Sequence, residues 1–274
     1  MNDQQIADGL KKIQKEILEE IHRICVKHDI KYFLAYGTLI GAIRHDGFIP
    51  WDDDIDIMMP YEDMLKFENV CKNELDHERF FYQTPDTDPE YRLSINRMRK
   101  NNTLLVEERY KNKKIHQGIF VDIYPLYGVP NGKLSRNLQV FRAMKRALYL
   151  LDEAPINQGT LMKVGATIML KLKTKKGKEK AQRKLLEKIA KYKYDESDWV
   201  ACLDSGLKTM RTVYPKDYYG KGKLHKFDEL EVIIPDNYDE ILKKTYGNYM
   251  ELPPVEQRKF HHDFSEIKLT EGKN

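Results

Sequence analysis

The stretch Trp51-Asp52-Asp53-Asp54-Ile55-Asp56-Ile57 carries four carboxylates within five residues, and apolar residues frame the last of them. If residues 54–57 form a strand, Asp54 and Asp56 point to the same face, because side chains alternate along a strand. Two carboxylates held side by side repel each other unless a cation lies between them. Oxygen ligands of this kind suit Mg²⁺ or Mn²⁺. The stretch therefore predicts a metal site, and with it a site for chemistry on phosphates.

The composition bounds the class of protein. The chain has 274 residues, 41% hydrophobic and 33% charged, which indicates a soluble globular protein of one large domain or two small ones. Its net charge of +4 is too small to argue for nucleic acid by itself. Cys25, Cys71 and Cys202 are odd in number and widely spaced, which fits neither a disulfide framework nor a zinc site and suits a reducing cytoplasm.

No segment of the sequence predicts a membrane span or a signal peptide. The first residues, MNDQQIADGLKK, lack the apolar core of a signal peptide, so we expect a cytoplasmic protein. The longest apolar run, residues 164–170, is far shorter than the roughly 20 residues that a spanning helix needs. Any membrane contact is therefore expected to be peripheral.

Helices and strands alternate in the first half of the chain. Apolar residues at three- and four-residue steps predict a long helix over residues 6–24. A buried strand over 32–36, a short helix over 38–44, the acidic strand and a helix over 63–75 follow, and then a strand over 118–124. This order points to an α/β or α+β fold. The region 134–193 has a mostly helical pattern, and the tail from Tyr214 is expected to fold over the core.

Gly37 and Thr38 stand where a strand gives way to a helix. Glycine lets the backbone approach a phosphate, and the N–H groups at a helix N-terminus favour an anion. A simple strand-to-helix turn is the alternative for an isolated Gly-Thr pair. Here the acidic strand follows about fifteen residues later, and that layout is typical of the nucleotidyltransferase fold, so we favour phosphate binding.

Other interpretations of the acidic stretch are less consistent with its neighbours. Asp52, Asp54 and Asp56 have the spacing of the first EF-hand ligands, but Ile57 stands where that loop needs glycine and Asp63 where it needs glutamate. The Asp-x-Asp motif of sugar-nucleotide glycosyltransferases also binds a metal-diphosphate, and this short motif alone does not exclude it. Asp52 and Asp53 can also be solvated turn residues, which we favour for Asp53.

Asp122 lies within the apolar run 119–123. A lone acid in such a strand is costly unless it is paired or binds a metal. It is either a buried partner of an arginine or a third carboxylate beside Asp54 and Asp56. We favour the metal role.

Arginines near these motifs are candidate substrate-binding residues, because a guanidinium suits a diphosphate. Arg44 lies between the glycine turn and the acids, next to His45, and Arg97 and Arg99 precede the sequence Asn101-Asn102. Each of these arginines can instead be a surface charge. The candidate acid–base histidines, for which surface or capping roles are the alternative, are His45, His116, His261 and His262.

Two ungapped motifs resemble the LicD family, which includes bacterial phosphorylcholine transferases and the animal fukutin-related transferases. They are residues 36–45, YGTLIGAIRH, and residues 47–56, GFIPWDDDID. Residues 118–125 resemble the family's third-carboxylate strand, and residues 246–250 with 252–254 and Arg258 resemble the C-terminal signature of its bacterial members. The middle of the chain carries no motif of the family.

The resemblance implies a nucleotidyltransferase-like α+β fold with a mixed sheet core and a helical, lysine-rich middle segment. By position, Asp54, Asp56 and Asp122 match the metal ligands, for Mg²⁺ or Mn²⁺, and Gly37 and Thr38 match the phosphate turn. We expect a catalytic core over residues 1–133, a helical region over 134–210 and a C-terminal segment over 211–274 that completes the site.

The activity that the resemblance implies is transfer of phosphorylcholine from CDP-choline to a sugar hydroxyl, with release of CMP. The acceptor is a glycan precursor of the teichoic acid or lipopolysaccharide type. Asp52 or one of the C-terminal histidines is expected to accept the hydroxyl proton. CDP-ribitol or CDP-glycerol is an alternative donor, because animal relatives use CDP-ribitol. A nucleotidyltransferase acting on another acceptor, such as nucleic acid, and an inactive binding protein are the rival classes.

Residues 171–193 hold eleven Lys or Arg against two Glu, beside an apolar stretch. A basic, partly apolar helix is typical of a membrane-surface segment, so peripheral contact with an anionic membrane, at its inner face, is one expectation. The alternative is a helix that packs on the core and exposes its lysines. The apolar residues concerned are Leu161, Met162, Val164, Ile168, Met169 and Leu172.

Overall fold

The computed structural model describes residues 3–151, 170, 172–258 and 264–270. The chain divides into two compact units. One contains residues 1–91, 95–125 and 217–274, and the other contains residues 92–94 and 126–216. The predicted helical region 134–210 lies within the second unit, and the predicted C-terminal segment belongs to the first from residue 217 onward. The three-part division of the sequence stays a prediction.

The first unit is built on a sheet in the order β1-β2-β6-β4-β3. The strands are β1 (Phe33–Leu34), β2 (Asp56–Pro60), β3 (Phe80–Gln83), β4 (Asn96–Lys100) and the first half of β6 (Phe120–Val129). The register pairs Leu34 with Ile57 and Arg97 with Asp122, in both cases between antiparallel strands. The expected α+β class is confirmed by this sheet and its helices.

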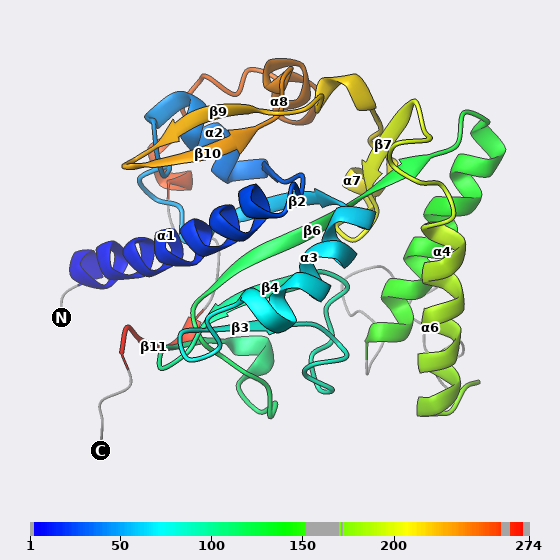
Figure 1. Cartoon of the computed structure of the whole chain (residues 1–274), viewed down its shortest axis with the longest axis horizontal. Coiled ribbons are helices and arrows are strands. Elements are labelled where there is room, and N and C mark those ends of the chain that lie inside the picture. The colour runs from blue at the N-terminus through cyan, green and yellow to red at the C-terminus, as the bar shows by residue number, and fades with distance from the viewer. Residues whose placement is uncertain (1–2, 152–169, 171, 259–263, 271–274) are drawn as a thin grey trace. The chain divides into compact units, whose positions relative to one another are not determined.

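Three helices pack on this sheet (Figure 1). They are α1 (Asp3–Lys27), α2 (Tyr36–His45) and α3 (Tyr61–Glu74). α1 contacts β4 and α3, while α2 and α3 both contact β2. The apolar stripe predicted for α1 is buried, with Ile17, Ile21 and Ile24 all at 0% exposure. Amphipathic spacing therefore decided which face of α1 meets the core.

The C-terminal segment folds over this unit, as predicted. It supplies α8 (Tyr238–Tyr246), the antiparallel pair β9–β10, and β11, which pairs with β5. Phe227, Ile234 and Leu242 join the same core cluster as Ile17 and Ile57. The remaining elements are β5 (Leu104–Glu107), β9 (Lys223–Phe227), β10 (Leu230–Ile234), β11 (Phe264–Lys268), η1 (Glu108–Tyr110), η2 (Lys216–Tyr218) and η3 (Val255–Gln257).

The second unit holds the helical, lysine-rich middle segment. Its helices α4 (Lys133–Leu150) and α6 (Lys175–Ile189) lie side by side (Figure 1). The second half of β6 pairs with β7 (Trp199–Cys202), which pairs with β8 (Tyr214–Pro215), and α7 (Leu207–Arg211) contacts α4 and β7. Gln139 of α4 donates to the carbonyls of Gly128 and Ile189, which ties the helices to β6.

The structure also bears on the expectations for the cysteines and for membrane spans. Cys25, Cys71 and Cys202 are buried free thiols, in agreement with the absence of a disulfide framework. Among the described residues no helix combines the length and apolarity needed to cross a bilayer. Most of the apolar residues expected beside the lysine-rich segment, namely Leu161, Met162, Val164, Ile168 and Met169, lie outside the described residues, as do Lys171, His261 and His262.

The burial of α1 predicts a stability difference between two of its faces. Ile21→Ala removes a fully buried side chain and is expected to lower the free energy of unfolding by about 2–5 kcal/mol. Val26→Ala, at a position 62% exposed on the same helix, should change it by less than about 0.5 kcal/mol. Urea denaturation measures both. Equal effects would show that the stripe does not anchor α1.

Candidate active site

Three carboxylates gather just before β2. Asp52, Asp53 and Asp54 each place a carboxylate oxygen within 4.8 Å of the other two. Asp52 and Asp53 are buried, and Asp54 is partly exposed. The backbone carbonyl of Asp53 accepts a hydrogen bond from the buried Gln14 of α1 at 2.8 Å. Asp53 is therefore a buried residue held by α1, and the expectation that it is a solvated turn residue is wrong.

Asp56 opens β2 beside this group and is also buried. Its Oδ1 atom has no hydrogen-bond partner in the described part of the chain. Burial raises the pKa of Asp56 well above its usual range, and the nearby charges of Asp54, Asp122 and Asp52 raise it further. A buried carboxylate oxygen without a partner, surrounded by other carboxylates, is the environment that a bound cation relieves.

The acidic strand begins later than predicted. β2 starts at Asp56 and not at Asp54: residues 52–55 have no regular secondary structure, and the backbone turns before them. That turn is closed by the Asp52 N–H, which donates to the carbonyl of Ile49 at 2.9 Å. Asp54 therefore lies just outside the strand, two residues before Asp56. The nearby charge of Asp54 is one of the causes that raise the pKa of Asp56.

Gly37 and Thr38 lie in the first turn of α2, next to the acids. A Cβ atom on Gly37 would come within 2.9 Å of Asp52 Oδ2, closer than real Cβ contacts, so a side chain here would displace the carboxylate. The Thr38 hydroxyl accepts a hydrogen bond from the Asp56 N–H at 2.9 Å. Tyr36 has a φ of 46°, which turns the chain sharply into α2. The predicted phosphate turn and the acids are therefore neighbours.

Asp122 lies on β6, and its backbone N–H donates to the carbonyl of Ile55 at 2.9 Å. Its carboxylate accepts hydrogen bonds from Arg97, 2.6 Å from Nε to Oδ1 and 3.4 Å from Nη2 to Oδ2. Nη1 of Arg97 donates to Glu107 at 2.5 Å, and the guanidinium lies 3.6 Å from the centre of the Phe120 ring. Both interpretations of Asp122 thus have support, since it is an arginine partner that also raises the pKa of Asp56.

Arg97 and Glu107 form a buried ion pair beside the site that the sequence does not predict. The sequence marks Arg97 as one of several candidate diphosphate ligands, and no motif marks Glu107. In the structure Arg97 is 1% exposed and shared by two carboxylates. Its charge lowers the pKa of Asp56, against the effects of burial and the neighbouring acids. The antiparallel register of β4 and β6, which sets Arg97 opposite Asp122, is the signal that sequence patterns alone do not supply.

The structure does not bring all the predicted binding residues together. Arg99 is buried and donates to Gln83 at 2.5 Å and to the Gly118 carbonyl at 2.6 Å. Arg44 lies in the last turn of α2, at the other end of the helix from Gly37, and donates to His45 at 3.0 Å. Burial and the charge of Arg44 lower the pKa of His45, which favours its neutral form. Their contacts with substrate stay predictions.

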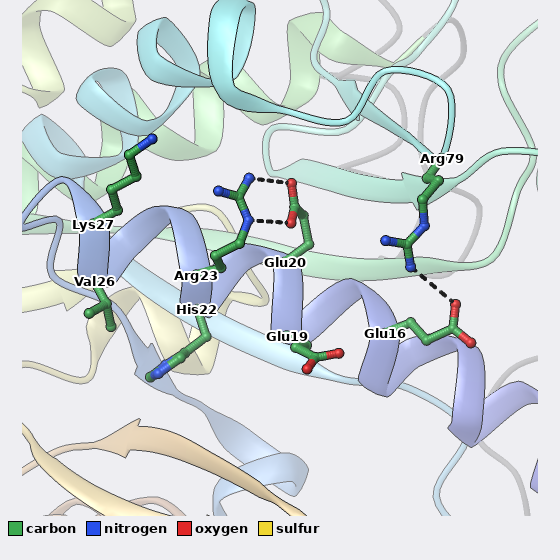
Figure 2. Close-up of a pocket in the computed structure, with 8 residues that line it drawn as sticks. All are labelled: Glu16, Glu19, Glu20, His22, Arg23, Val26, Lys27 and Arg79. Atoms are coloured by element: carbon green, nitrogen blue, oxygen red, sulfur yellow. Dashed lines mark hydrogen bonds and ion pairs between the residues drawn. The ribbon is translucent and has the colours of Figure 1, made fainter.

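A recess of about 610 Å³ lies elsewhere, along α1 (Figure 2). Arg23 and Glu20 form an ion pair in its wall, and Arg79 reaches Glu16 across it. None of the predicted site residues lines it, so its size does not make it the candidate site. Its lining residues are Glu16, Glu19, Glu20, His22, Arg23, Val26, Lys27 and Arg79.

The residues at the acidic group fit a hard divalent cation. The donors are carboxylate oxygens on a short turn and two strands, the set that Mg²⁺ and Mn²⁺ prefer. The buried Oδ1 of Asp56 is a position where such an ion would find a ligand without a competing hydrogen bond from the described residues. Asp54 and Asp56 would hold it, with Asp52 and Asp122 adjacent.

Comparison with known proteins gives consistent matches. The family model "LicD/FKTN/FKRP, nucleotidyltransferase domain" matches residues 29–148. Lipopolysaccharide cholinephosphotransferase LicD of Haemophilus influenzae is 30% identical over 257 residues, which cover 90% of this chain and 92% of that protein. An uncharacterized protein of Rickettsia prowazekii is 31% identical over 112 residues, 40% of this chain and 39% of that protein. The matched domain contains Gly37, all of the clustered acids and Arg97.

The Arg97–Glu107 pair predicts a pH dependence of stability. Burial tends to raise the pKa of Glu107, but Arg97 and Arg109 lower it to about 2, from an ordinary 4.5. A depressed pKa stabilises the fold above pH 4.5, and that contribution, about 3 kcal/mol, is lost as the pH falls toward 2. Urea midpoints between pH 5 and 2 should therefore fall more steeply for the wild type than for Glu107→Gln.

Glu108→Gln is the matched control, since the Glu108 side chain is 53% exposed. Its curve should follow that of the wild type. If the Glu107→Gln curve also runs parallel to the wild type, the buried pair does not stabilise the fold as described.

Proposed function

We propose the function of this chain from the family to which it belongs, the LicD family. The chain transfers phosphorylcholine from CDP-choline to a sugar hydroxyl of a cell-surface glycan precursor, of the teichoic acid or lipopolysaccharide type, and releases CMP. The relative that supports this proposal is named a lipopolysaccharide cholinephosphotransferase and aligns along nearly its whole length. The observation that carries the proposal is the buried, unpartnered Oδ1 of Asp56 among the carboxylates.

Asp54 and Asp56 would bind Mg²⁺ or Mn²⁺, and Asp122 would be the third ligand. Bound there with the diphosphate, the ion supplies neutralisation of the charge at the phosphorus and on the departing CMP. Arg97 fixes Asp122 through two hydrogen bonds, so this carboxylate is oriented before any ligand arrives. The Thr38 hydroxyl fixes the start of β2 through the Asp56 N–H. Orienting the ligands in advance lowers the reorganisation that the reaction requires.

The phosphate turn would hold the donor from the other side. The first intrahelical bond of α2 joins the Leu39 N–H to the Ala35 carbonyl, so the N–H groups of the preceding first-turn residues lie at the helix N-terminus. Such N–H groups favour an anion, and Gly37 leaves the backbone accessible. The turn touches Asp52, so phosphate oxygens and ion would be held by adjoining residues.

The attacking hydroxyl must lose a proton. Asp52 is the candidate base that the structure describes, because it is buried, touches Gly37 and lies within the acidic group. His261 and His262, the other candidates, lie outside the described residues. The rival donors CDP-ribitol and CDP-glycerol would use the same phosphate turn and acids, so these residues do not select the alcohol.

Substitution of the acids tests the site. Asp56→Asn or Asp54→Asn should lower CMP release by at least on the order of a thousandfold, because a lost ligand charge misplaces the ion. Asp56→Asn should not lower the urea midpoint without metal, since it removes a buried charge. Glu78→Gln, at an exposed position on the same unit, is the control and should retain full rate. Near-normal turnover in either Asn variant would remove these acids from the mechanism.

The donor can be identified by thermal protection. With Mg²⁺ present, CDP-choline should raise the melting temperature, because a ligand of the folded state stabilises it by mass action. CDP-ribitol and CDP-glycerol should raise it less at the same concentration. Equal or greater protection by CDP-ribitol would contradict the choline assignment and leave the acidic site intact.

Lipid-linked acceptors would require this protein to work at a membrane surface. α6 supports that proposal, because its exposed residues include several lysines. Each lysine near an anionic leaflet contributes about 1 kcal/mol, so binding to anionic vesicles should be present at low salt and fall steeply as salt rises. It should also weaken when four exposed lysines of α6 become glutamine. These are Lys176, Lys180, Lys184 and Lys188.

The matched control removes the same charge from exposed lysines of the first unit. Those residues are Lys12, Lys66, Lys72 and Lys244. Co-sedimentation with vesicles measures all three proteins. If the two quadruple variants weaken equally, net charge and not α6 binds the vesicles, and if the wild type does not bind at low salt the membrane proposal is wrong.

A further inference from the structure

Arg258 lies over the ring of Trp51, the residue that precedes the acidic group, and Arg44 is joined to the same ring through His45. The Arg258 guanidinium is 5.3 Å from the centre of the Trp51 ring. The His45 ring meets the same indole edge-on, with 6.3 Å between ring centres, and His45 accepts the hydrogen bond from Arg44 Nε. We call these four residues, Arg44, His45, Trp51 and Arg258, the arginine cluster. All four are partly buried.

The cluster is held by backbone carbonyls of the C-terminal segment. Arg44 Nη1 donates to the carbonyl oxygens of Tyr249 at 2.5 Å and Glu251 at 3.2 Å. Arg258 Nε donates to the carbonyl of Pro253 at 2.8 Å. A guanidinium has five N–H donors. Within the described residues, Nη2 of Arg44 and both Nη groups of Arg258 keep donors that make no hydrogen bond.

No carboxylate of the described chain forms an ion pair with either arginine. Other inward-facing arginines differ, because Arg97 bonds two carboxylates and Arg146 bonds Asp204 at 2.6 Å. Arg99 also lacks a carboxylate, but at 1% exposure it is sealed from any ligand. Burial and the charge of Arg258 lower the pKa of Arg44, so the two cations repel each other. An anion between them would relieve this repulsion.

The cluster is separate from the phosphate turn. Arg44 follows Gly37 by seven residues on one helix, so the two are roughly 10 Å apart at 1.5 Å per residue. Trp51, by contrast, directly precedes Asp52. The cluster is therefore set apart from the N-terminus of α2, and through Trp51 it adjoins the acidic stretch in sequence. A phosphate bound there would sit near the reaction without occupying the place of the donor diphosphate.

We propose that the arginine cluster binds a second phosphate group, one carried by the sugar acceptor. The proposal rests on the proposed function, in which the donor diphosphate occupies the phosphate turn and the acids. Arginine binds phosphate with paired N–H donors, and the indole face holds Arg258 in place while leaving its Nη groups available. The acceptor class is thus a phosphorylated sugar, with its phosphate at the cluster and its hydroxyl directed toward the acids.

Trp51 makes the cluster observable, because the chain has only two tryptophans. In full-length protein with Trp199→Phe, titration with inorganic phosphate should change Trp51 fluorescence and saturate. Adding Arg258→Gln should weaken phosphate binding by at least about tenfold, the effect of losing a charged hydrogen-bond donor pair. The phosphate affinity of Arg258→Lys should lie between those of the Trp199→Phe protein and the Arg258→Gln variant. Equal urea midpoints for the variants exclude misfolding.

Arg136→Gln in the same Trp199→Phe protein is the control, because it removes one arginine of α4, which belongs to the other unit. It should leave phosphate binding unchanged. The phosphate titration is then repeated with Mg²⁺ and saturating CMP. This tells a phosphate site for the acceptor from the phosphate site of the donor nucleotide. If phosphate still binds at the cluster, the site is distinct from that of the nucleotide, as proposed. If CMP displaces the phosphate, the cluster belongs to the donor and the proposal is wrong.

Absence of a fluorescence change, or equal affinity in Arg258→Gln, also overturns the proposal. CMP release from CDP-choline, measured on the same Trp199→Phe protein, keeps this outcome apart from the proposed function. Turnover without phosphate binding would reject the cluster alone. Phosphate binding that depends on Arg258, without turnover of CDP-choline, would retain an anion site and reject the donor assignment.

Discussion

Repulsion among buried carboxylates is the interaction on which the candidate site depends. Asp56 is buried, its Oδ1 has no hydrogen-bond partner in the described residues, and the charges of Asp54, Asp122 and Asp52 oppose its ionisation. Such an arrangement costs stability, and a fold retains it only where the rest of the structure compensates. Arg97 supplies part of that compensation by bonding Asp122. A cation at Asp54 and Asp56 would supply the remainder.

The surrounding fold serves to hold these charges in place. β1 and β6 flank β2, so Asp56 and Asp122 meet on neighbouring strands. α2 carries the glycine turn to Asp52 at one end, and at the other end Arg44 bonds the carbonyls of the C-terminal segment. Residues of α2 and of the C-terminal segment thereby meet at Trp51.

The sequence predicted what periodicity and local chemistry control. The helix α1, the acidic stretch, the glycine turn and the strand with Asp122 were all recognisable, because each carries its signal within a few residues. The features that the sequence did not predict depend on contacts between residues far apart in the chain. The hydrogen bond from Gln14 of α1 to the carbonyl of the buried Asp53 joins distant residues, and the partnership of Arg97 with Asp122 depends on strand register. A local sequence pattern does not predict such long-range contacts.

The central claim is that the acids bind a divalent cation together with the donor nucleotide. Crystals grown with Mn²⁺ and CMP would test it most directly, because Mn²⁺ gives an anomalous signal that locates the ion independently of the phases of the protein. The account predicts a peak within about 2.5 Å of carboxylate oxygens of both Asp54 and Asp56, with the phosphate of CMP beside it. CMP bound with no ion at these two residues would contradict it.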